Sequence, residues 1–332
     1  MKRHVSGFLT VLTVAIFAMW RVTATTSARD ALEPGTSLGI GSVPNLRDVG
    51  GYTTQDGSVV RRGIAYRSDQ LNPIAPDDTK KLAALGLRND FDLRTEAERQ
   101  KRPDELPPGV KEVWLNVLAD AQGAGPAQIE KLLSNPKEAN EVLGDGKAAE
   151  AFVKVYREFI TLPSAKTSFG QLFVELGQER QLPSLFHCTT GKDRTGWATA
   201  ALLTLLGVPK GQVYEDFLRS NEYILPAFKQ YIDHFTAAGG DPSIPQDILG
   251  VKAEYLDAAF DEMQTQYGGI EGYFQRGLGI DHAGQQPLRD RFLKRSSSAT
   301  VINPLLLPFS NEGSSLQSIV PSRLCEDAWQ FD

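Results

Sequence analysis

Apolar positions along the chain follow two alternating spacings, one typical of strands and one typical of helices. Short apolar runs predict strands at residues 63–67, 88–93, 113–117 and 182–186. Helical spacing predicts helices at residues 77–85, 152–160, 168–176, 198–206, 211–219, 221–237, 249–266 and 282–294, with short surface helices within 118–150. This order predicts an α/β domain with a central, largely parallel sheet flanked by helices, a helical C-terminal half, and a site at the carboxyl ends of the strands.

Local signals indicate where some of these elements begin and end. Asp77 is a candidate N-cap of the first predicted helix, and Gly86 is its stop. Thr95 and Glu98 have the spacing of a capping box, so a helix is expected to begin there. Asp92 therefore ends the strand that precedes this helix.

The two ends of the chain differ from its middle. Residues 1–28 have a basic start, an uncharged apolar run and then small residues, which is typical of an export signal. The run at residues 5–20 is short beside the roughly 20 apolar residues of a membrane span, and an uncleaved anchor is the alternative. Residues 29–40 are predicted to be a linker, 41–295 the domain and 296–332 a flexible tail. We expect an exported protein, periplasmic or secreted, without a stable membrane span in its mature form.

Charge and cysteine content exclude several classes of function. The 35 Lys and Arg against 41 Asp and Glu give a formal net charge of −6, which argues against nucleic-acid binding. The four histidines and two cysteines form no cluster with metal-site spacing, so no metal or organic cofactor is expected. An even pair of cysteines in an exported protein could form a disulfide, but Cys188 is predicted to be a free reactive thiol, with Cys325 incidental in the tail.

The segment His-Cys-Thr-Thr-Gly-Lys-Asp-Arg-Thr-Gly at residues 187–196 carries the chemistry. An apolar strand precedes it and an apolar helix follows, so its backbone N–H groups would surround an anion at the helix N-terminus. Cys188 would lie at the floor of this loop, where the helix dipole and Arg194 favour its thiolate. Arg194 can donate two parallel N–H bonds to a phosphate, which a lysine cannot do. A thiolate beneath a bound phosphate predicts a cysteine phosphatase.

This loop resembles the signature of the protein tyrosine phosphatase superfamily, His-Cys-x-x-Gly-x-x-Arg-Thr-Gly. Its Lys-Asp pair makes it similar to the bacterial-type tyrosine phosphatase branch, whose members often act on both phosphoproteins and phosphoinositides. Further segments match motifs of that branch in the same order, at residues 45–51, 66–69, 92–98, 213–221 and 267–273. The resemblance implies a cysteine-phosphatase fold and a phosphoric monoester hydrolase of the tyrosine type, working through a cysteinyl-phosphate intermediate on phosphoprotein or phosphoinositide substrates.

Two other functions stay open. A catalytically silent phosphate-binding module would keep the shape of the loop, but intact Cys188 and Arg194 argue against it. An arsenate reductase would need further redox cysteines near the loop, and Cys325 is poorly placed for that role.

The resemblance implies a role for each position of the loop. Cys188 is the nucleophile, and Arg194 binds the phosphate oxygens together with the backbone amides of the loop. The substrate-binding positions are Thr189, Thr190, Gly191, Lys192 and Thr195. Thr195 is placed to donate to the leaving thiolate in the second step. His187 either orients the loop or packs as an ordinary residue at the end of the strand.

The general acid has two candidates. A leaving oxygen needs a proton from a carboxylic acid near the loop. The resemblance favours Asp92, at the end of the Asp-Leu-Arg strand. Asp193 is the rival, because some lipid phosphatases of the superfamily carry their acid inside the loop. Either aspartate could instead be structural, Asp193 by pairing with Lys192 and Asp92 by capping a helix.

Other cations in the matching motifs bear on the substrate. Lys192 beside Arg194 suits a substrate with more than one phosphate, such as an inositol lipid, although it could simply pair with Asp193. Arg47, Arg67 and Arg94 lie in matching motifs and are expected either to line the pocket or to brace the loop.

Residues 221–237 carry many large apolar side chains at helical spacing. Ordinary core packing is the favoured interpretation. The alternative is a helical lid over the phosphate pocket, as the relatives often have, with its hinge at Gly239, Gly240 and Pro242.

Overall fold

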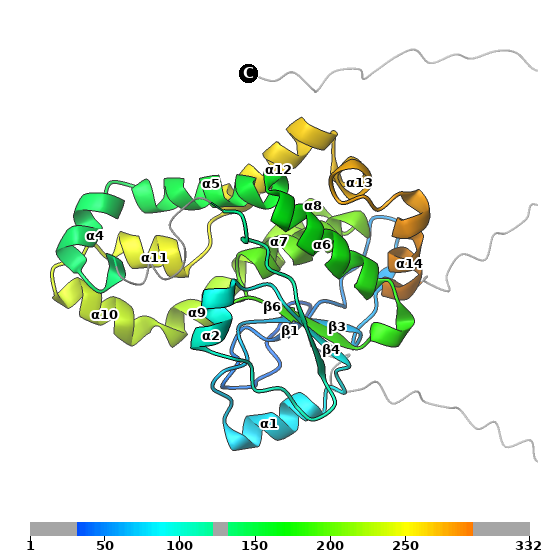
Figure 1. The fold of residues 1–332 in the computed structure, drawn as a ribbon, viewed down its shortest axis with the longest axis horizontal. Coiled ribbons are helices and arrows are strands. Elements are labelled where there is room, and N and C mark those ends of the chain that lie inside the picture. The colour runs from blue at the N-terminus through cyan, green and yellow to red at the C-terminus, as the bar shows by residue number, and fades with distance from the viewer. Residues whose placement is uncertain (1–31, 122–131, 295–332) are drawn as a thin grey trace, which may run out of the picture. The chain divides into compact units, whose positions relative to one another are not determined.

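A computed structural model describes residues 32–121 and 132–294 of the chain. Five of the described strands form one sheet in the order β1-β3-β6-β4-β5. Their bounds are Arg47–Asp48 (β1), Ala65–Ser68 (β3), Asn89–Asp92 (β4), Lys111–Trp114 (β5) and Ser184–His187 (β6). Strands β3, β6, β4 and β5 run parallel, whereas β1 pairs antiparallel with β3. The predicted α/β fold with a central, largely parallel sheet is confirmed (Figure 1).

Helices make up most of the remaining described chain, and those after β6 form the predicted helical C-terminal half. The helices are α1 (Pro76–Ala83), α2 (Glu96–Lys101), α4 (Pro136–Leu143), α5 (Lys147–Thr161), α6 (Pro163–Leu176), α7 (Arg194–Leu205), α8 (Lys210–Leu218), α9 (Ser220–Ala227), α10 (Lys229–Ala237), α11 (Ser243–Leu249), α12 (Ala253–Tyr267), α13 (Ile270–Gly272) and α14 (His282–Phe292). A 3-10 turn (Glu179–Gln181), a π-helical turn (Tyr273–Gly277) and a small sheet of β2 (Val59–Val60) with β7 (Leu293–Lys294) complete the described elements.

Some predictions fall outside the described residues. These are the export signal at 1–28, the start of the linker at 29–31 and the tail at 296–332. Across the two described stretches, none of the helices combines the length and the hydrophobicity that crossing a bilayer demands.

Both faces of the sheet are buried, as is usual for a parallel sheet. Leu185 of β6 packs in a cluster with Leu82 of α1, on the side of the sheet where Figure 1 shows α1. The next residue, Phe186, points the other way into the main core, which includes Phe159 of α5 and Phe169 of α6. Helices therefore cover both sides of the sheet, as the sequence predicts.

The register of the parallel strands brings their carboxyl ends to one level. His187, the last residue of β6, pairs with Ser68 of β3 on one side and with Asp92 of β4 on the other. Asp92 in turn pairs with Trp114, the last residue of β5. The segment that follows His187 therefore lies at the edge of the sheet where four strands end, which is where ligands bind in such folds.

Several element bounds differ from the predictions for local reasons. The first helix begins at Pro76 with Ala75 as its N-cap, because the fixed φ of proline suits the first helical position, and Asp77 lies inside the first turn. The strand predicted at 113–117 is displaced to Lys111–Trp114, since its neighbour β4 ends at Asp92. The capping box of Thr95 is confirmed.

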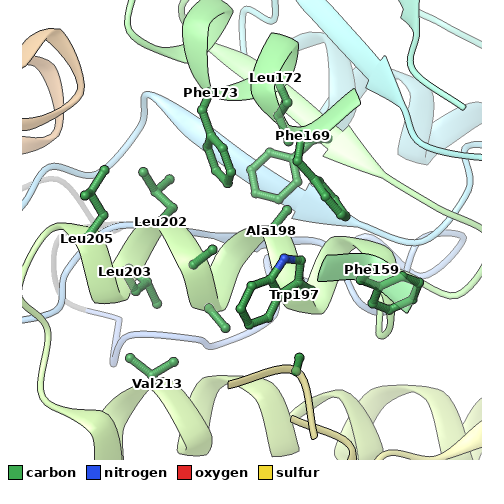
Figure 2. Packing of buried hydrophobic residues seen from close by; sticks show 14 of the residues in the cluster. Phe159, Phe169, Leu172, Phe173, Trp197, Ala198, Leu202, Leu203, Leu205 and Val213 are labelled. Atoms are coloured by element: carbon green, nitrogen blue, oxygen red, sulfur yellow. The ribbon is translucent and has the colours of Figure 1, made fainter. Parts of the chain in front are cut away.

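Helix α7 is the centre of the main core. It begins at Arg194, directly after the candidate loop, and each of its residues except Thr204 is buried. Trp197 packs edge to face against Phe260 and Tyr273, with ring centroids 5.4 and 5.7 Å apart. Figure 2 shows this helix beneath the aromatic side chains of α6. The loop is thus attached to a rigid element, which is what a precise binding site needs.

The segment at 221–237 is two helices rather than one. Helix α9 ends after Pro226, and Phe228 leaves helical geometry at φ −102° and ψ 8° before α10 begins. Phe235 of α10 is 3% exposed in a small separate cluster with residues of α4 and α11. Tyr231 remains 38% exposed. Packing therefore accounts for part of the stripe, and the lid stays a prediction.

Candidate active site

The loop between β6 and α7 is held from outside by its carbonyl groups. The contacts are Gln70 N to Thr189 O at 3.2 Å, Asn45 Nδ2 to Thr190 O at 2.9 Å, and Arg67 Nη2 to Gly191 O at 2.8 Å. In a peptide unit the N–H points opposite to the C=O. Carbonyls used on the outside therefore direct the N–H groups toward the interior of the loop, which is the arrangement of an anion-binding nest.

Gly191 is required by this geometry. Its φ is +67°, in the region that disfavours side chains. A Cβ at this position would lie 2.2 Å from the carbonyl oxygen of Ser68 on β3. The glycine thus lets the loop approach the neighbouring strand closely enough to close.

A second layer of charge supports the loop from behind. The carboxylate of Asp216 on α8 accepts from Arg47 at 2.8 Å, from Arg67 at 2.5 Å and from the hydroxyl of Tyr52 at 2.9 Å. Burial raises the pKa of Asp216, but the two arginines outweigh this and keep the pKa low. Since Arg67 also holds the carbonyl of Gly191, it contacts the back of the loop and not its interior.

Cys188 lies at the inner end of the loop, 1% exposed and without a disulfide in the described part of the chain. Thr195 follows one residue after Arg194, and its buried hydroxyl has no hydrogen-bond partner among residues 32–121 and 132–294. Thr189 and Thr190, the next two residues of the loop, are half-buried. The predicted nucleophile and the predicted substrate-binding positions therefore lie on one closed turn.

Arg194 is held by Glu98, which the sequence placed in a helix cap and in a matching motif without assigning it a role in the loop. Its Nη1 and Nη2 atoms lie 2.8 and 2.7 Å from the two carboxylate oxygens of Glu98. The hydroxyl of Thr189 and the backbone N–H of Thr95 also donate to Glu98. Although burial raises the pKa of Glu98, the charge and hydrogen bonds of Arg194 hold it far below its usual value. The capping box was the sequence signal for Glu98, but it did not indicate the contact with the loop.

Asp193 lies at the mouth of the loop, with 18% of its side chain exposed. Its Oδ1 atom accepts from Lys192 Nζ at 2.8 Å and from the hydroxyl of Tyr156 at 2.9 Å. The ammonium group of Lys192 also lies 4.6 Å from the ring centre of Phe152. Tyr156 and Phe152 come from α5, where the sequence predicted only core packing.

Asp92 has a different environment. Its side chain is fully buried, and its oxygens accept from Arg94 Nε and Nη2 and from Arg99 Nε, each at 2.9 Å. Burial raises the pKa of Asp92, but the hydrogen bonds and charge of Arg94 lower it below the usual value. Two arginines therefore favour the charged form of Asp92.

His187 joins the end of β6 to a group of buried charges. Its Nε2 atom lies 3.3 Å from both Asp90 and Asp104, and its Nδ1 lies 3.2 Å from the carbonyl of Cys188. Burial alone would lower the pKa of His187, but the two carboxylates raise it well above its usual value. Nδ1 of the imidazolium can then donate to the carbonyl of Cys188, and its positive charge offsets the negative charges of the two carboxylates. Asp90, Asp104 and His187 lie close enough together to hold a metal ion. Protonated His187 and Arg94, however, already offset the negative charges of the two aspartates.

A buried cysteine and an arginine at the two ends of an anion-binding loop define a cysteine-dependent phosphatase. The model of the tyrosine phosphatase family matches residues 38–294, and the chain belongs to that family. It is a phosphomonoesterase of the tyrosine-phosphatase type.

Three relatives illustrate the similarity. A protein of Cupriavidus necator assigned as a tyrosine-protein phosphatase is 30% identical over 260 residues, which cover 74% of this chain and 85% of the relative. The triple specificity protein phosphatase PtpB of Mycobacterium tuberculosis is 29% identical over 270 residues, covering 74% of this chain and 95% of the relative. A tyrosine-protein phosphatase of Nostoc commune is 29% identical over 232 residues, covering 68% and 72%.

Proposed function

We propose that this phosphatase hydrolyses both phosphoprotein and phosphoinositide monoesters, with Cys188 as nucleophile, Arg194 as phosphate ligand and Asp193 as general acid. The observation that carries this proposal is the closed loop, in which carbonyls bound from outside leave the N–H groups for an anion. The reaction proceeds in two steps.

In the first step the thiolate of Cys188 attacks phosphorus. The S–P bond forms as the ester P–O bond breaks, and the proton of Asp193 passes to the leaving oxygen. Arg194 and the loop amides stabilise the negative charge on the three equatorial oxygens. Glu98 holds Arg194 by its two terminal nitrogens and leaves the Nε edge of the guanidinium for the phosphate.

In the second step water attacks the cysteinyl-phosphate. Asp193, now a carboxylate, takes a proton from this water, and the S–P bond breaks to release inorganic phosphate. The unpartnered hydroxyl of Thr195 is available to donate to the departing thiolate. These transfers return both side chains to their starting states.

Asp193 is a better candidate for the general acid than Asp92, because the two side chains differ in exposure and in their bound partners. Asp193 is partly exposed at the mouth of the loop, whereas Asp92 is fully buried between two arginines that favour its charged form. A general acid must be protonated when substrate is bound. The negative charge of a bound phosphate raises the proton affinity of a nearby carboxylate, and it does so most for the carboxylate closest to it. We therefore assign the proton transfer to Asp193.

Breadth of substrate is supported by Lys192. This buried cation adjoins the loop, and its positive charge can attract a second phosphate. The name of the Mycobacterium tuberculosis relative, a triple specificity phosphatase, supports the same breadth. The basic and apolar start of the chain supports export as the location of this activity.

Phosphate release from phosphotyrosine peptides, phosphoserine peptides and phosphoinositides tests this proposal, with Cys188→Ser as the blank. Turnover of peptides and inositol lipids that disappears in Cys188→Ser is the expected result. Turnover confined to phosphotyrosine would contradict the proposed breadth. Binding of tungstate without any turnover would show a silent phosphate-binding module.

A comparison of Asp193→Asn with Asp92→Asn tests the acid. Loss of a general acid costs about 10²–10⁴-fold in kcat/KM, which reports the first step, and this loss is confined to poor leaving groups. Asp193→Asn is expected to show that selectivity. Asp92→Asn is expected to lower turnover of all aryl phosphates alike, because it releases two arginines beneath the loop. The reverse pattern would assign the acid to Asp92.

A further inference from the structure

Tyr156 lies on α5, 37 residues before Asp193, and is fully buried. A buried tyrosine hydroxyl requires a partner, and here the partner is the proposed acid, 2.9 Å away. We propose that Tyr156 is a positioning residue that orients the carboxyl group of Asp193 for proton transfer to the leaving oxygen. This inference rests on the proposed role of Asp193.

The orientation follows from which oxygen is bound. Tyr156 and Lys192 both donate to Oδ1 of Asp193. An oxygen that accepts two hydrogen bonds is a poor site for the proton of the acid form. The transferable proton must therefore reside on Oδ2, so the two donors determine which atom of Asp193 carries it.

The side chain of Asp193 does not cap helix α7, and this is a second, independent sign of its orientation. Asp193 is the N-cap of α7, where aspartate ordinarily accepts from a backbone N–H of the first turn. Its side chain makes no such bond, and its ψ of −81° departs from the extended geometry usual for a cap. The carboxylate turns toward α5 instead, and α7 goes without this side-chain cap.

The ring of Tyr156 has little freedom to move. Its centroid lies 5.1 Å from that of Phe159, 5.9 Å from that of Phe217 and 5.7 Å from that of Tyr255. Burial first, and then the charge of Asp193, raises the pKa of Tyr156 well above its usual value. The hydroxyl therefore remains a donor throughout the working pH range. A fixed donor orients its acceptor at little entropic cost.

The test is Tyr156→Phe, which keeps the ring and removes only the hydroxyl. Steady-state kinetics would compare aryl phosphates whose leaving groups range from dinitrophenol to tyrosine. We expect kcat/KM for phosphotyrosine, which reports the first step, to fall by about 10-fold or more, within the range of general acid catalysis. For dinitrophenyl phosphate, whose leaving group needs no proton, kcat/KM should change less than about 2-fold.

Tyr255→Phe is the matched control. Tyr255 lies in the same aromatic cluster, but its hydroxyl donates to the carbonyl of Asp247 at 3.1 Å and not to the loop. We expect its removal to leave the dependence on the leaving group as in the parent protein. An equal loss for every leaving group in Tyr156→Phe, or no loss, would overturn the inference.

A double variant provides a second test that does not depend on the stability of one protein. If Tyr156 acts through Asp193, adding Tyr156→Phe to Asp193→Asn should cause no further loss of kcat/KM. Additive losses would show that Tyr156 acts elsewhere and would refute the inference. Failure of the parent protein to hydrolyse even dinitrophenyl phosphate would instead refute the proposed function, so the two failures are distinct.

Discussion

Glu98 binds Arg194 through both of its carboxylate oxygens, although the two residues are 96 positions apart in the chain. Both side chains are more than nine-tenths buried, at 8% and 7% exposure. The guanidinium is thus oriented before any phosphate enters the loop. This orientation reduces the entropy that substrate binding must otherwise overcome.

Replacing Glu98 with Gln should lower both activity and stability. The change leaves the buried charge of Arg194 without its partner, and breaking such a pair costs about 3–5 kcal/mol. A misplaced arginine should lower kcat/KM on the order of 100-fold. Urea unfolding and initial rates measure the two effects.

Glu96→Gln, on the exposed side of the same helix, is the control for Glu98→Gln. It should leave both quantities near those of the parent protein. Unchanged activity in Glu98→Gln would show that Arg194 needs no such support.

Stability should fall in acid because of Glu98. Its pKa in the folded protein lies far below that of the unfolded chain, so its contribution is complete above about pH 4.5 and is lost as the pH falls. Asp92 and Asp216, whose pKa values are also lowered, act in the same direction. Thermal unfolding from pH 7 to pH 3 should show a falling Tm below about pH 4.5. The fall should be smaller in Glu98→Gln, and an identical fall would exclude Glu98 as a contributor.

Arg194→Lys should separate charge from geometry. A lysine keeps the positive charge but cannot bind Glu98 and a phosphate through planar pairs of N–H groups. Losing one such donor to a developing charge costs about 10²–10³-fold in kcat. Arg157→Lys, at a surface pair with Glu262, is the control and should have little effect. Equal activity of Arg194→Lys and the parent protein would mean that charge alone suffices.

Gly191→Ala should distort the loop. The residue has φ +67°, and a Cβ there would lie 2.2 Å from the backbone of Ser68. Strained backbone of this kind costs about 1–3 kcal/mol, and the contact with β3 must also open. Tungstate affinity and Tm measure both effects. Gly211→Ala, in the first turn of α8 with no atom near the added Cβ, should lower neither quantity. A harmless Gly191→Ala would contradict the closed geometry.

The sequence predicted the parts of the site that lie next to one another in the chain. Cys188 and Arg194 are six residues apart, and the strand before them and the helix after them follow from their apolar runs. Thr95 and Glu98 were likewise recognisable as a cap, because a capping box has a fixed local spacing. Geometry of this kind can be predicted because the residues that form it are neighbours in the sequence.

Contacts between distant segments were beyond such reasoning. Tyr156 looked like any apolar residue of an amphipathic helix, since its hydroxyl carries no periodic signal. The sequence placed Asp92 at the end of a strand, but it did not indicate that Arg94 and Arg99 bind its carboxylate. Which partner a buried polar group finds depends on tertiary packing, and one-dimensional spacing does not contain that information.

The loop depends on residues far from it on both sides. Asn45 binds its backbone across 145 positions of sequence, and Arg67 does so while held by Asp216, which lies after the loop. A ribosome that has just added Gly196 has already made every residue of the signature. The chain at that moment still lacks the helix that secures Arg67. The signature is therefore synthesised before the loop can adopt its folded conformation. A nascent or truncated chain ending before α8 would contain the cysteine without a phosphate-binding site around it.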